Sequence, residues 1–370
     1  MNPSFRIGKV FGISLGVNWS WAILFALIVW SLAANFFPAQ NPGLSRVEYA
    51  AMAVVAAVLF FCSLLLHELG HAYQARREGV EIEGITLWLF GGVARFKGMF
   101  ESAGAEFRIA VAGPLVSLAL GVVFVSLALA VHGAGAIDGV AAWLGYINFA
   151  LLLFNLLPAL PLDGGRVFRA ALWALRGDFG WATRIASDVG RAFGFLMVGV
   201  GILLVVLGSI SGVWLAFVGL FLVQAAALEG RYGVLREALG DLRVRDLMVR
   251  EPVTVRADVS LAEFMDEVAR AHRYTTYPVR DDGRVVGLLP FSAVARVPRG
   301  DWGGHLVSEC MLPRDQVPVV TEGEELMEAV AELGHGKIDR ALVLDGDRLV
   351  GLLSVTDVGR LLAVTNRRRP

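Results

Sequence analysis

Long apolar runs alternate with short polar connections through residues 1–230, and patterning typical of a soluble protein follows after residue 236. A helix needs roughly 20 apolar residues to cross a bilayer. Runs that meet this criterion predict six transmembrane helices, at 17–37, 50–73, 108–131, 141–160, 192–208 and 213–229. Only the short segment GSISG separates the last two, which predicts a tight helical hairpin.

Between the second and third runs the pattern changes to that of strands. Residues 78–98 alternate polar and apolar side chains, include Thr86 and Trp88, and carry Gly91 and Gly92 near their centre. Such alternation around glycines predicts a β-hairpin and not a helix.

The part after residue 243 contains an internal repeat with a spacing of about 64 residues. VRDLM at 244–248 is echoed by VSECM at 307–311, and VVGLLPFSAV at 285–294 by LVGLLSVTDV at 349–358. Each copy predicts a small α+β unit, and the two would bury a shared core that neither completes alone. We therefore expect a polytopic α-helical membrane domain with a membrane-associated β-hairpin, followed by two α+β units. The expected boundaries are a membrane domain at 1–230, a linker at 231–243, and units at 244–303 and 304–370.

Composition and charge agree with this division. Of the 370 residues 56% are hydrophobic, against roughly 45–50% in average proteins. The net charge of −1 gives no reason to expect a nucleic-acid partner. Cys62 falls in a membrane run and Cys310 in the soluble part, which rules out a disulfide framework.

Basic residues mark the orientation of the predicted helices. They gather in alternate connections, whereas the opposite connections, such as residues 132–139, are nearly free of them. The positive-inside rule then places both termini and the soluble units in the cytoplasm of a multi-pass protein of the cell (inner) membrane. The residues concerned are Arg6, Lys9, Arg76, Arg77, Arg95, Lys97, Arg108, Arg166, Arg169, Arg176, Arg184 and Arg231.

The second run contains the motif HELGH at residues 67–71. Positions i and i+4 share one face of a helix, so His67 and His71 could bind the same ion. Glu68 would then lie where it can act as general base, the arrangement of H-E-x-x-H zinc proteases. A chance match is the alternative, but charged and metal-binding side chains are costly inside a bilayer, which favours function.

A catalytic zinc usually has three protein ligands and one open position. Since the other histidines lie in a loop on the opposite side or in the soluble part, we expect a carboxylate as the third ligand. The fourth run ends in residues 155–166, NLLPALPLDGGR, which supply Asp163. Pro158 and Pro161 would break the helix, and Gly164-Gly165 would allow a tight turn that returns Asp163 toward the membrane interior. The alternative is an ordinary cap or loop aspartate.

Asn155 lies inside the fourth run and has two interpretations of equal weight. Its amide could donate a hydrogen bond to an oxyanion or to a substrate backbone. It could equally hold two helices together by a hydrogen bond.

These residues together resemble the site-2 proteases, which are intramembrane zinc metalloproteases. The resemblance rests on HELGH at 67–71, on Asn155, and on PLDGG at 161–165. It implies one catalytic Zn²⁺ bound by His67, His71 and Asp163, with Glu68 as base and Asn155 assisting the transition state or the substrate. It further implies that GGVARF at 91–96 belongs to a hairpin that holds a transmembrane protein substrate as an added strand, with Gly91 and Gly92 in the binding segment.

The segment 105–118 is similar to the third core span of that family, with one difference. Many relatives carry an asparagine a few residues after Gly113-Pro114, where this chain has Ser117. A serine can still form a hydrogen bond.

The repeat after residue 243 resembles a pair of cystathionine-β-synthase (CBS) domains. Such pairs commonly bind adenine nucleotides and often associate through their helices, so the resemblance implies a nucleotide as regulator and is compatible with a homodimer formed through the CBS helices. In the second unit Ser354 and Asp357 match the ribose-contacting positions, whereas the first has 290–293, PFSA, and lacks the carboxylate. Helix capping is an alternative role for Ser354 and Asp357.

The leading hypothesis is an intramembrane zinc protease regulated through its CBS domains. A CBS-gated ion transporter or channel is a second hypothesis, although only one broken run is evident and it has no repeat partner. A catalytically inactive protease-like scaffold is a third, and the intact His67, Glu68, His71 and Asp163 argue against it.

Overall fold

The computed structural model describes residues 4–10, 12–88, 91–97, 102–133, 135–240, 242–333 and 338–367. The chain forms two compact units, Met1–Gly233 and Val234–Pro370.

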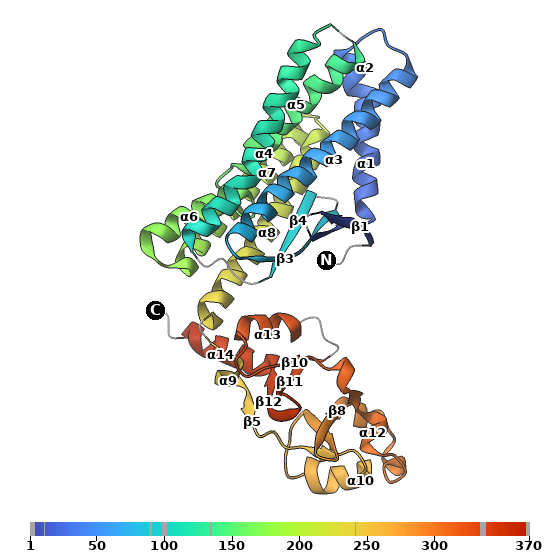
Figure 1. Cartoon of the computed structure of the whole chain (residues 1–370), viewed down its shortest axis with the longest axis vertical. Coiled ribbons are helices and arrows are strands. Elements are labelled where there is room, and N and C mark those ends of the chain that lie inside the picture. The colour runs from blue at the N-terminus through green and yellow to red at the C-terminus, as the bar shows by residue number, and fades with distance from the viewer. Residues whose placement is uncertain are drawn as a thin grey trace. The chain divides into compact units, whose positions relative to one another are not determined.

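Among the described residues, six helices are long and apolar enough to cross a membrane, as predicted (Figure 1). The first span combines α1 (Ser20–Ser31), a π-helical turn (Leu32–Phe36) and α2 (Phe37–Gln40). The other five spans are α3 (Arg46–Arg77), α4 (Ala103–Ala130), α5 (Ala136–Asn155), α7 (Phe179–Val206) and α8 (Ser211–Leu239). The prediction of six apolar spans is confirmed, and the chain is a multi-pass membrane protein.

Capping residues set the helix starts that apolar runs alone do not show. Ser45 and Glu48 form a capping box at the start of α3: Glu48 N donates to Ser45 Oγ (3.3 Å), and Ser45 N donates to Glu48 Oε2 (2.7 Å). Asp178 caps α7 by accepting from Trp181 N at 2.7 Å. The helix α7 therefore begins well before the apolar run at 192–208, because its first turns carry polar residues that hydropathy does not count.

The fourth span ends earlier than predicted, at Asn155 and not at residue 160. After an irregular segment with Pro158 and Pro161, the chain enters α6 (Asp163–Arg176), which is not one of the spans. Gly164 and Gly165 lie in the first turn of α6, so the expectation of a tight glycine turn was wrong. A Cβ atom at Gly164 would lie 2.2 Å from Leu156 O, and one at Gly165 would lie 2.3 Å from Leu160 N. The glycines allow α6 to pack against the backbone of the segment before it.

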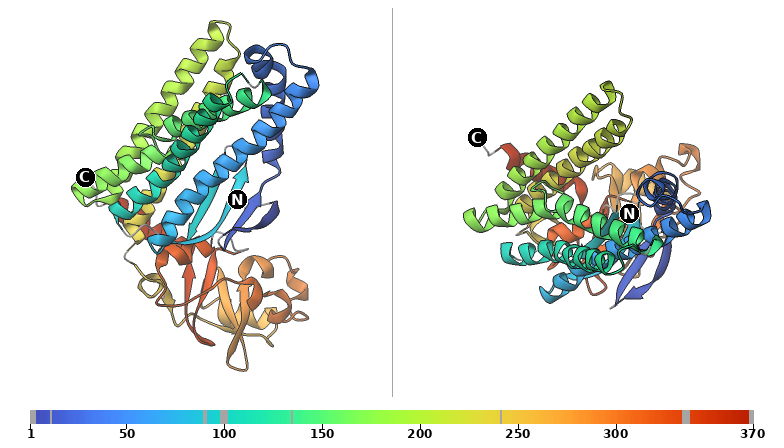
Figure 2. Two further views of the ribbon diagram at one scale, coloured as in Figure 1. Left: turned by 45° about the horizontal axis from the view of Figure 1, so that its top comes forward. Right: turned by 90° about the horizontal axis from the view of Figure 1, so that it is seen from above.

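Four strands form one sheet in the order β1 (Phe5–Val10), β2 (Ile13–Val17), β3 (Glu81–Trp88) and β4 (Gly91–Lys97). The strand β2 pairs parallel with β3, and β3 pairs antiparallel with β4, with Leu87 opposite Gly92 and Trp88 opposite Gly91. The hairpin was predicted and β1 and β2 were not. Since β4 ends the strand order, it is an edge strand, and both β3 and β4 run alongside α3 (Figure 2).

The described residues of the second unit form two mixed four-stranded sheets. One has the order β6 (Val255–Arg256), β7 (Thr276–Asp281), β8 (Arg284–Pro290), β9 (Leu312–Pro313). The other has the order β10 (Val319–Val320), β11 (Arg340–Asp345), β12 (Arg348–Ser354), β5 (Val249–Arg250). The helical elements of this unit are α9 (Val244–Leu247), α10 (Leu261–Glu263), a π-helical turn (Phe264–Ala269), α11 (Phe291–Val294), α12 (Val307–Cys310), α13 (Leu326–Leu333), α14 (Val355–Arg367), and 3-10 turns at Arg299–Asp301 and Arg314–Gln316.

The two repeats exchange their first segments. Val244 and Met248, from the first copy, lie in the core of the second sheet beside Val320 and Leu353. Val307, from the second copy, lies in the core of the first sheet. A third apolar cluster combines residues of both copies, among them Val285, Leu288, Leu342 and Leu344. The two copies therefore share a core, as the repeat predicted. The fully buried Leu239, at the end of α8, belongs to the core of this unit although it lies in the segment expected as a linker.

Candidate metal centre

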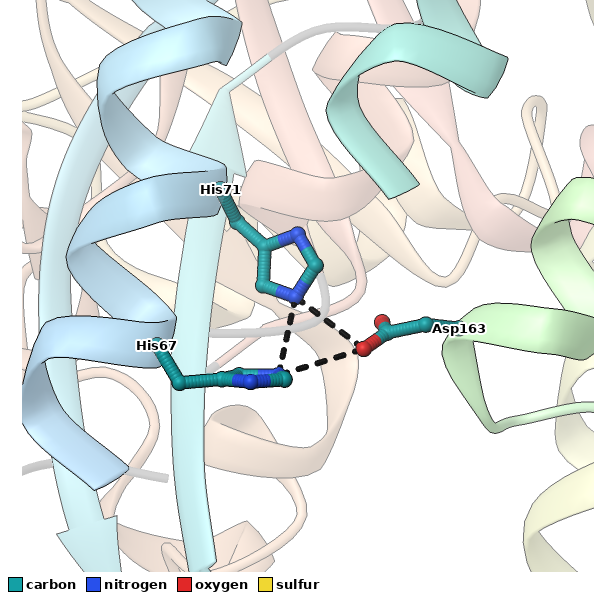
Figure 3. A group of neighbouring side chains, drawn as sticks. All are labelled: His67, His71 and Asp163. Atoms are coloured by element: carbon teal, nitrogen blue, oxygen red, sulfur yellow. Dashed lines mark hydrogen bonds and ion pairs between the residues drawn. The ribbon is translucent and has the colours of Figure 1, made fainter. Parts of the chain in front are cut away.

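Three side chains from two helices converge in the first unit (Figure 3). His67 and His71 project from the same face of α3, and Asp163 approaches from the first residue of α6. The distance from Asp163 Oδ2 to each histidine Nε2 is 3.2 Å, and the two Nε2 atoms lie 3.2 Å apart. Among the described residues, this is the group of histidine, cysteine and carboxylate side chains with the geometry of a metal site.

The outer nitrogens of both rings are held by α4. His71 Nδ1 lies 2.7 Å from the carbonyl oxygen of Ile109, and His67 Nδ1 lies 2.8 Å from Ser117 Oγ. A carbonyl can only accept, so His71 Nδ1–H donates and a neutral ring presents a lone pair at Nε2. With His67 in the same tautomer, three acceptor atoms face one another, and a cation between them would satisfy all three.

The spacing of the donor atoms fits zinc. Bonds of about 2.0–2.2 Å to nitrogen and oxygen in a tetrahedron separate neighbouring ligands by about 3.3 Å. The observed separations of 3.2 Å agree with this value. Two imidazoles and a carboxylate are also a donor set known from catalytic zinc sites, which leave the fourth position open.

Two glycines bring α3 and α4 together at this point. A Cβ atom at Gly113 would lie 2.2 Å from His71 Nε2 and 2.6 Å from His67 Nε2. A Cβ atom at Gly70 would lie 3.0 Å from the carbonyl oxygen of Ala112. Gly113 therefore forms the wall of the metal site, and any side chain there would occupy the space beside the donor atoms. No pattern in the sequence assigns either glycine to the metal site, although Gly113-Pro114 marks the segment similar to the third core span.

Glu68, the expected base, follows His67 on α3 and lies beneath the edge strand β4. A Cβ atom at Gly92 would lie 2.3 Å from Glu68 Cγ and 3.0 Å from its Oε1. The Glu68 carboxylate thus lies against the strand that is expected to hold substrate. Gly91 precedes Gly92 at the start of β4.

Asn155 is half-buried at the last residue of α5 and forms no side-chain hydrogen bond with another described residue. The interhelical contact considered for it is made instead by Asn148, two turns earlier on α5. The buried Asn148 Nδ2 donates to Leu144 O (2.8 Å) and to Ser63 Oγ on α3 (3.4 Å). Among the described residues the Asn155 amide therefore has no side-chain partner, and it is close in sequence to Asp163, whereas Asn148 connects α5 to α3.

In the second unit, Ser354 ends β12 and Asp357 lies in the first turn of α14. The buried Ser354 Oγ accepts from Thr356 N at 3.1 Å, and Asp357 Oδ1 accepts from Arg360 at 3.3 Å. Both side chains therefore have local partners, and the hydrogen bond of Ser354 is of the capping kind.

Comparison with known proteins assigns a family or domain type to each of the two units. The family described as Peptidase family M50 matches residues 55–141 and 130–197, and the CBS domain matches residues 244–300 and 307–363. The chain is similar to the Rip3 protein of Mycobacterium tuberculosis, with 37% identity over 100% of this chain and 95% of that protein. It is also similar to MJ0392 of Methanocaldococcus jannaschii, named a zinc metalloprotease, with 30% identity over 98% of this chain and 97% of that protein.

The chain belongs to peptidase family M50. A solved structure titled as a site-2 protease from Methanocaldococcus jannaschii is 30% identical, with a TM-score of 0.44, and the match covers 61% of this chain and 94% of that chain. The family match and the full-length relatives identify this M50 chain as a zinc metalloprotease, and two CBS domains follow its membrane unit, as the sequence motifs predicted. Membership in the family decides against the transporter hypothesis.

Proposed function

We propose that this M50 chain hydrolyses peptide bonds in or near transmembrane segments of other membrane proteins. His67, His71 and Asp163 would hold one zinc ion, and Glu68 would act as the general base. The position of Glu68 carries the proposal, because its side chain lies against Gly92 of an edge strand and is next in sequence to His67.

A zinc ion in such a site supplies Lewis acidity toward a peptide carbonyl and a lowered pKa for a bound water. The Glu68 carboxylate would accept a proton as the water attacks the carbonyl carbon, and would return it to the departing amine nitrogen. Water is consumed, the C–N bond breaks, and a new carboxyl group and a new amine result. The Asn155 amide, which has no other partner among the described residues, would donate to the developing oxyanion or to the substrate backbone.

The substrate would bind as an added strand on β4. A peptide bond inside a helix is shielded by its hydrogen bonds, so the substrate must be extended where it is cut. An edge strand offers unpaired backbone groups to an extended segment. Gly91 and Gly92 carry no side chains, and they leave the backbone of β4 accessible to a substrate close to Glu68.

The test compares the parent protein with Glu68→Gln for cleavage of a panel of transmembrane-helix substrates in detergent and in liposomes. Glu78→Gln is the matched control, because it makes the same change just beyond the end of α3, where Glu78 pairs with the exposed Arg108. We expect zinc in all three proteins and cleavage by the parent and Glu78→Gln alone. Cleavage by Glu68→Gln at the parent rate would refute the role of Glu68. Zinc binding without cleavage by any of the three would favour an inactive scaffold.

We also propose that an adenine nucleotide bound to the CBS pair regulates cleavage, since Ser354 and Asp357 lie together at the start of α14. A ligand can shift activity only if it binds two states of the protein unequally. Binding of ATP, ADP and AMP to the full chain should weaken in Asp357→Ala. If none of the three binds the parent protein, this regulation is refuted and helix capping is the remaining role of the two residues.

We also predict that both termini and the CBS domains are cytoplasmic, and that the CBS helices form a homodimer. A reporter inserted after Gly135 should be found outside the cytoplasm, since that connection lies opposite the basic ones. The mass of the protein in micelles, corrected for detergent, tests the dimer.

A further inference from the structure

A buried cluster of charges joins α6 to two of its neighbours. Arg169, on α6, is 3% exposed, and Glu106, on α4, is 1% exposed. Arg169 Nε donates to Glu106 Oε1 at 2.8 Å, and its Nη2 donates to the same oxygen. Its remaining nitrogen, Nη1, donates to Glu229 Oε2 on α8 at 3.2 Å. No step of the proposed reaction uses these groups.

One face of α4 supports all three proposed zinc ligands. Glu106, Ile109, Gly113 and Ser117 follow one another at spacings of three, four and four residues, which places them in one stripe along the helix. Ser117 holds the ring of His67, and the carbonyl of Ile109 holds the ring of His71. Glu106, at one end of the stripe, binds the arginine of the helix that supplies Asp163.

We propose that Arg169 is a positioning residue that, through Glu106 and Glu229, fixes α6 so that Asp163 completes the metal site. Asp163 is the ligand most in need of such support, since it comes from a different helix than the histidines. Arg169 lies six positions after Asp163, a distance of about 9 Å along the helix. A tilt of α6 by about 5° at Arg169 would displace Asp163 by about 0.8 Å, more than the roughly 0.5 Å that a functional site tolerates.

The chemistry of the cluster indicates that it positions α6 and does not mainly stabilise the fold. Buried ion pairs often contribute no more to stability than apolar side chains of similar volume. What the arginine adds is a rigid planar fork of donors, which fixes direction as well as distance. Here the fork is shared between carboxylates of two different helices, so it defines the position of α6 relative to both.

Two variants test the proposal by their affinity for zinc. This affinity can be measured without any proteolysis, so the positioning role of Arg169 and the proposed cleavage can fail independently. Arg169→Lys keeps the charge and loses the fork. The double variant Glu106→Leu/Arg169→Met removes the buried charges and keeps apolar packing. Arg108→Lys is the matched control, since Arg108 also lies on α4 and forms a two-pronged pair with Glu78, but its side chain is 55% exposed and is not bonded to α6.

Zinc affinity is measured in detergent by competition with a chromophoric chelator. The absorption spectrum of the Co²⁺ form reports the geometry of the ligands, and thermal melting of the zinc-free protein reports its stability. We expect both variants to bind zinc about 10-fold or more weakly, the loss typical of outer partners of metal ligands. The Co²⁺ spectrum should change in both, and the double variant should melt close to the parent. Parent-like zinc affinity and spectrum in the folded double variant would overturn the proposal, as would a lowered melting temperature with unchanged zinc binding.

Discussion

The substitution Gly113→Ala adds a single methyl group at the wall of the metal site. Its Cβ atom would lie 2.2 Å from His71 Nε2 and 2.6 Å from His67 Nε2. Carbon and nitrogen atoms in ordinary contact are about 3.5 Å apart, so both rings would have to retreat by about 1 Å. Zinc–nitrogen bonds tolerate deviations of only about 0.2 Å. The rings therefore cannot yield to the methyl group and also keep their bonds to the metal.

The expected loss of zinc affinity is at least about 100-fold, the upper end of the effect of losing an outer partner. That factor corresponds to about 2.7 kcal/mol. The helix itself does not oppose the change, since alanine is favoured over glycine inside a helix by about 1 kcal/mol. Zinc binding and the stability of the zinc-free protein are therefore expected to move independently.

The assay is a chelator competition on the purified protein, together with a melting curve without zinc. Gly199→Ala, in α7, is the matched control, because a Cβ atom there would meet no described atom within 4 Å apart from the backbone of its own helix. It should bind zinc like the parent protein. If Gly113→Ala also binds zinc like the parent, the position of the metal against α4 is refuted.

Three further predictions concern the surroundings of the site. Ser117→Ala removes the partner of His67 Nδ1, so zinc affinity should fall by about 10–100-fold, whereas parent-like affinity would show that the 2.8 Å contact does not orient the ring. Gly92→Ala should displace Glu68 and reduce cleavage of a transmembrane substrate with zinc content unchanged, and full activity would contradict the contact between β4 and Glu68. Hydrogen bonds from Arg108 lower the pKa of Glu78 from its ordinary value of 4.5 to about 2. This ion pair therefore stabilises the zinc-free protein above pH 4.5, and the stabilisation is lost as the pH falls toward 2. The melting temperatures of the parent and of Glu78→Gln should therefore converge over that interval, and a constant difference would refute the pairing.

The shared orientation of His67 and His71 could be predicted because helical periodicity alone places them on one face of α3. Asp163 followed from the number of ligands that zinc requires and from the absence of another suitable histidine. The CBS pair could be predicted because a repeat is visible in the sequence itself. In each case the information lies in local spacing or in self-similarity.

The remaining parts of the site depend on how separate helices pack. The carbonyl of Ile109 and the missing side chain of Gly113 belong to α4, and nothing in their local pattern refers to the histidines of α3. Gly164 and Gly165 were expected to form a turn, because a glycine pair serves equally for turns and for close approach. Which of the two applies depends on the backbone of Leu156 and Leu160 against it.

The start of α7 and the strands β1 and β2 also could not be predicted from local sequence. Hydropathy counts apolar residues, so α7 begins well before its apolar run, where Asp178 caps it. The strands β1 and β2 left a weak signal in the alternating Ile13, Leu15 and Val17, of which Ile13 and Leu15 are buried. The strand β2 completes its pairing only with β3, more than sixty residues later.

The most direct test of the metal centre is X-ray absorption at the zinc edge on the full-length protein loaded with one equivalent of zinc. The structure predicts a first shell of nitrogen and oxygen atoms only, at about 2.0–2.2 Å, with two imidazoles, and a shell altered in Asp163→Asn. A sulfur atom at about 2.3 Å, or a shell that is unchanged by Asp163→Asn, would contradict the assignment of His67, His71 and Asp163.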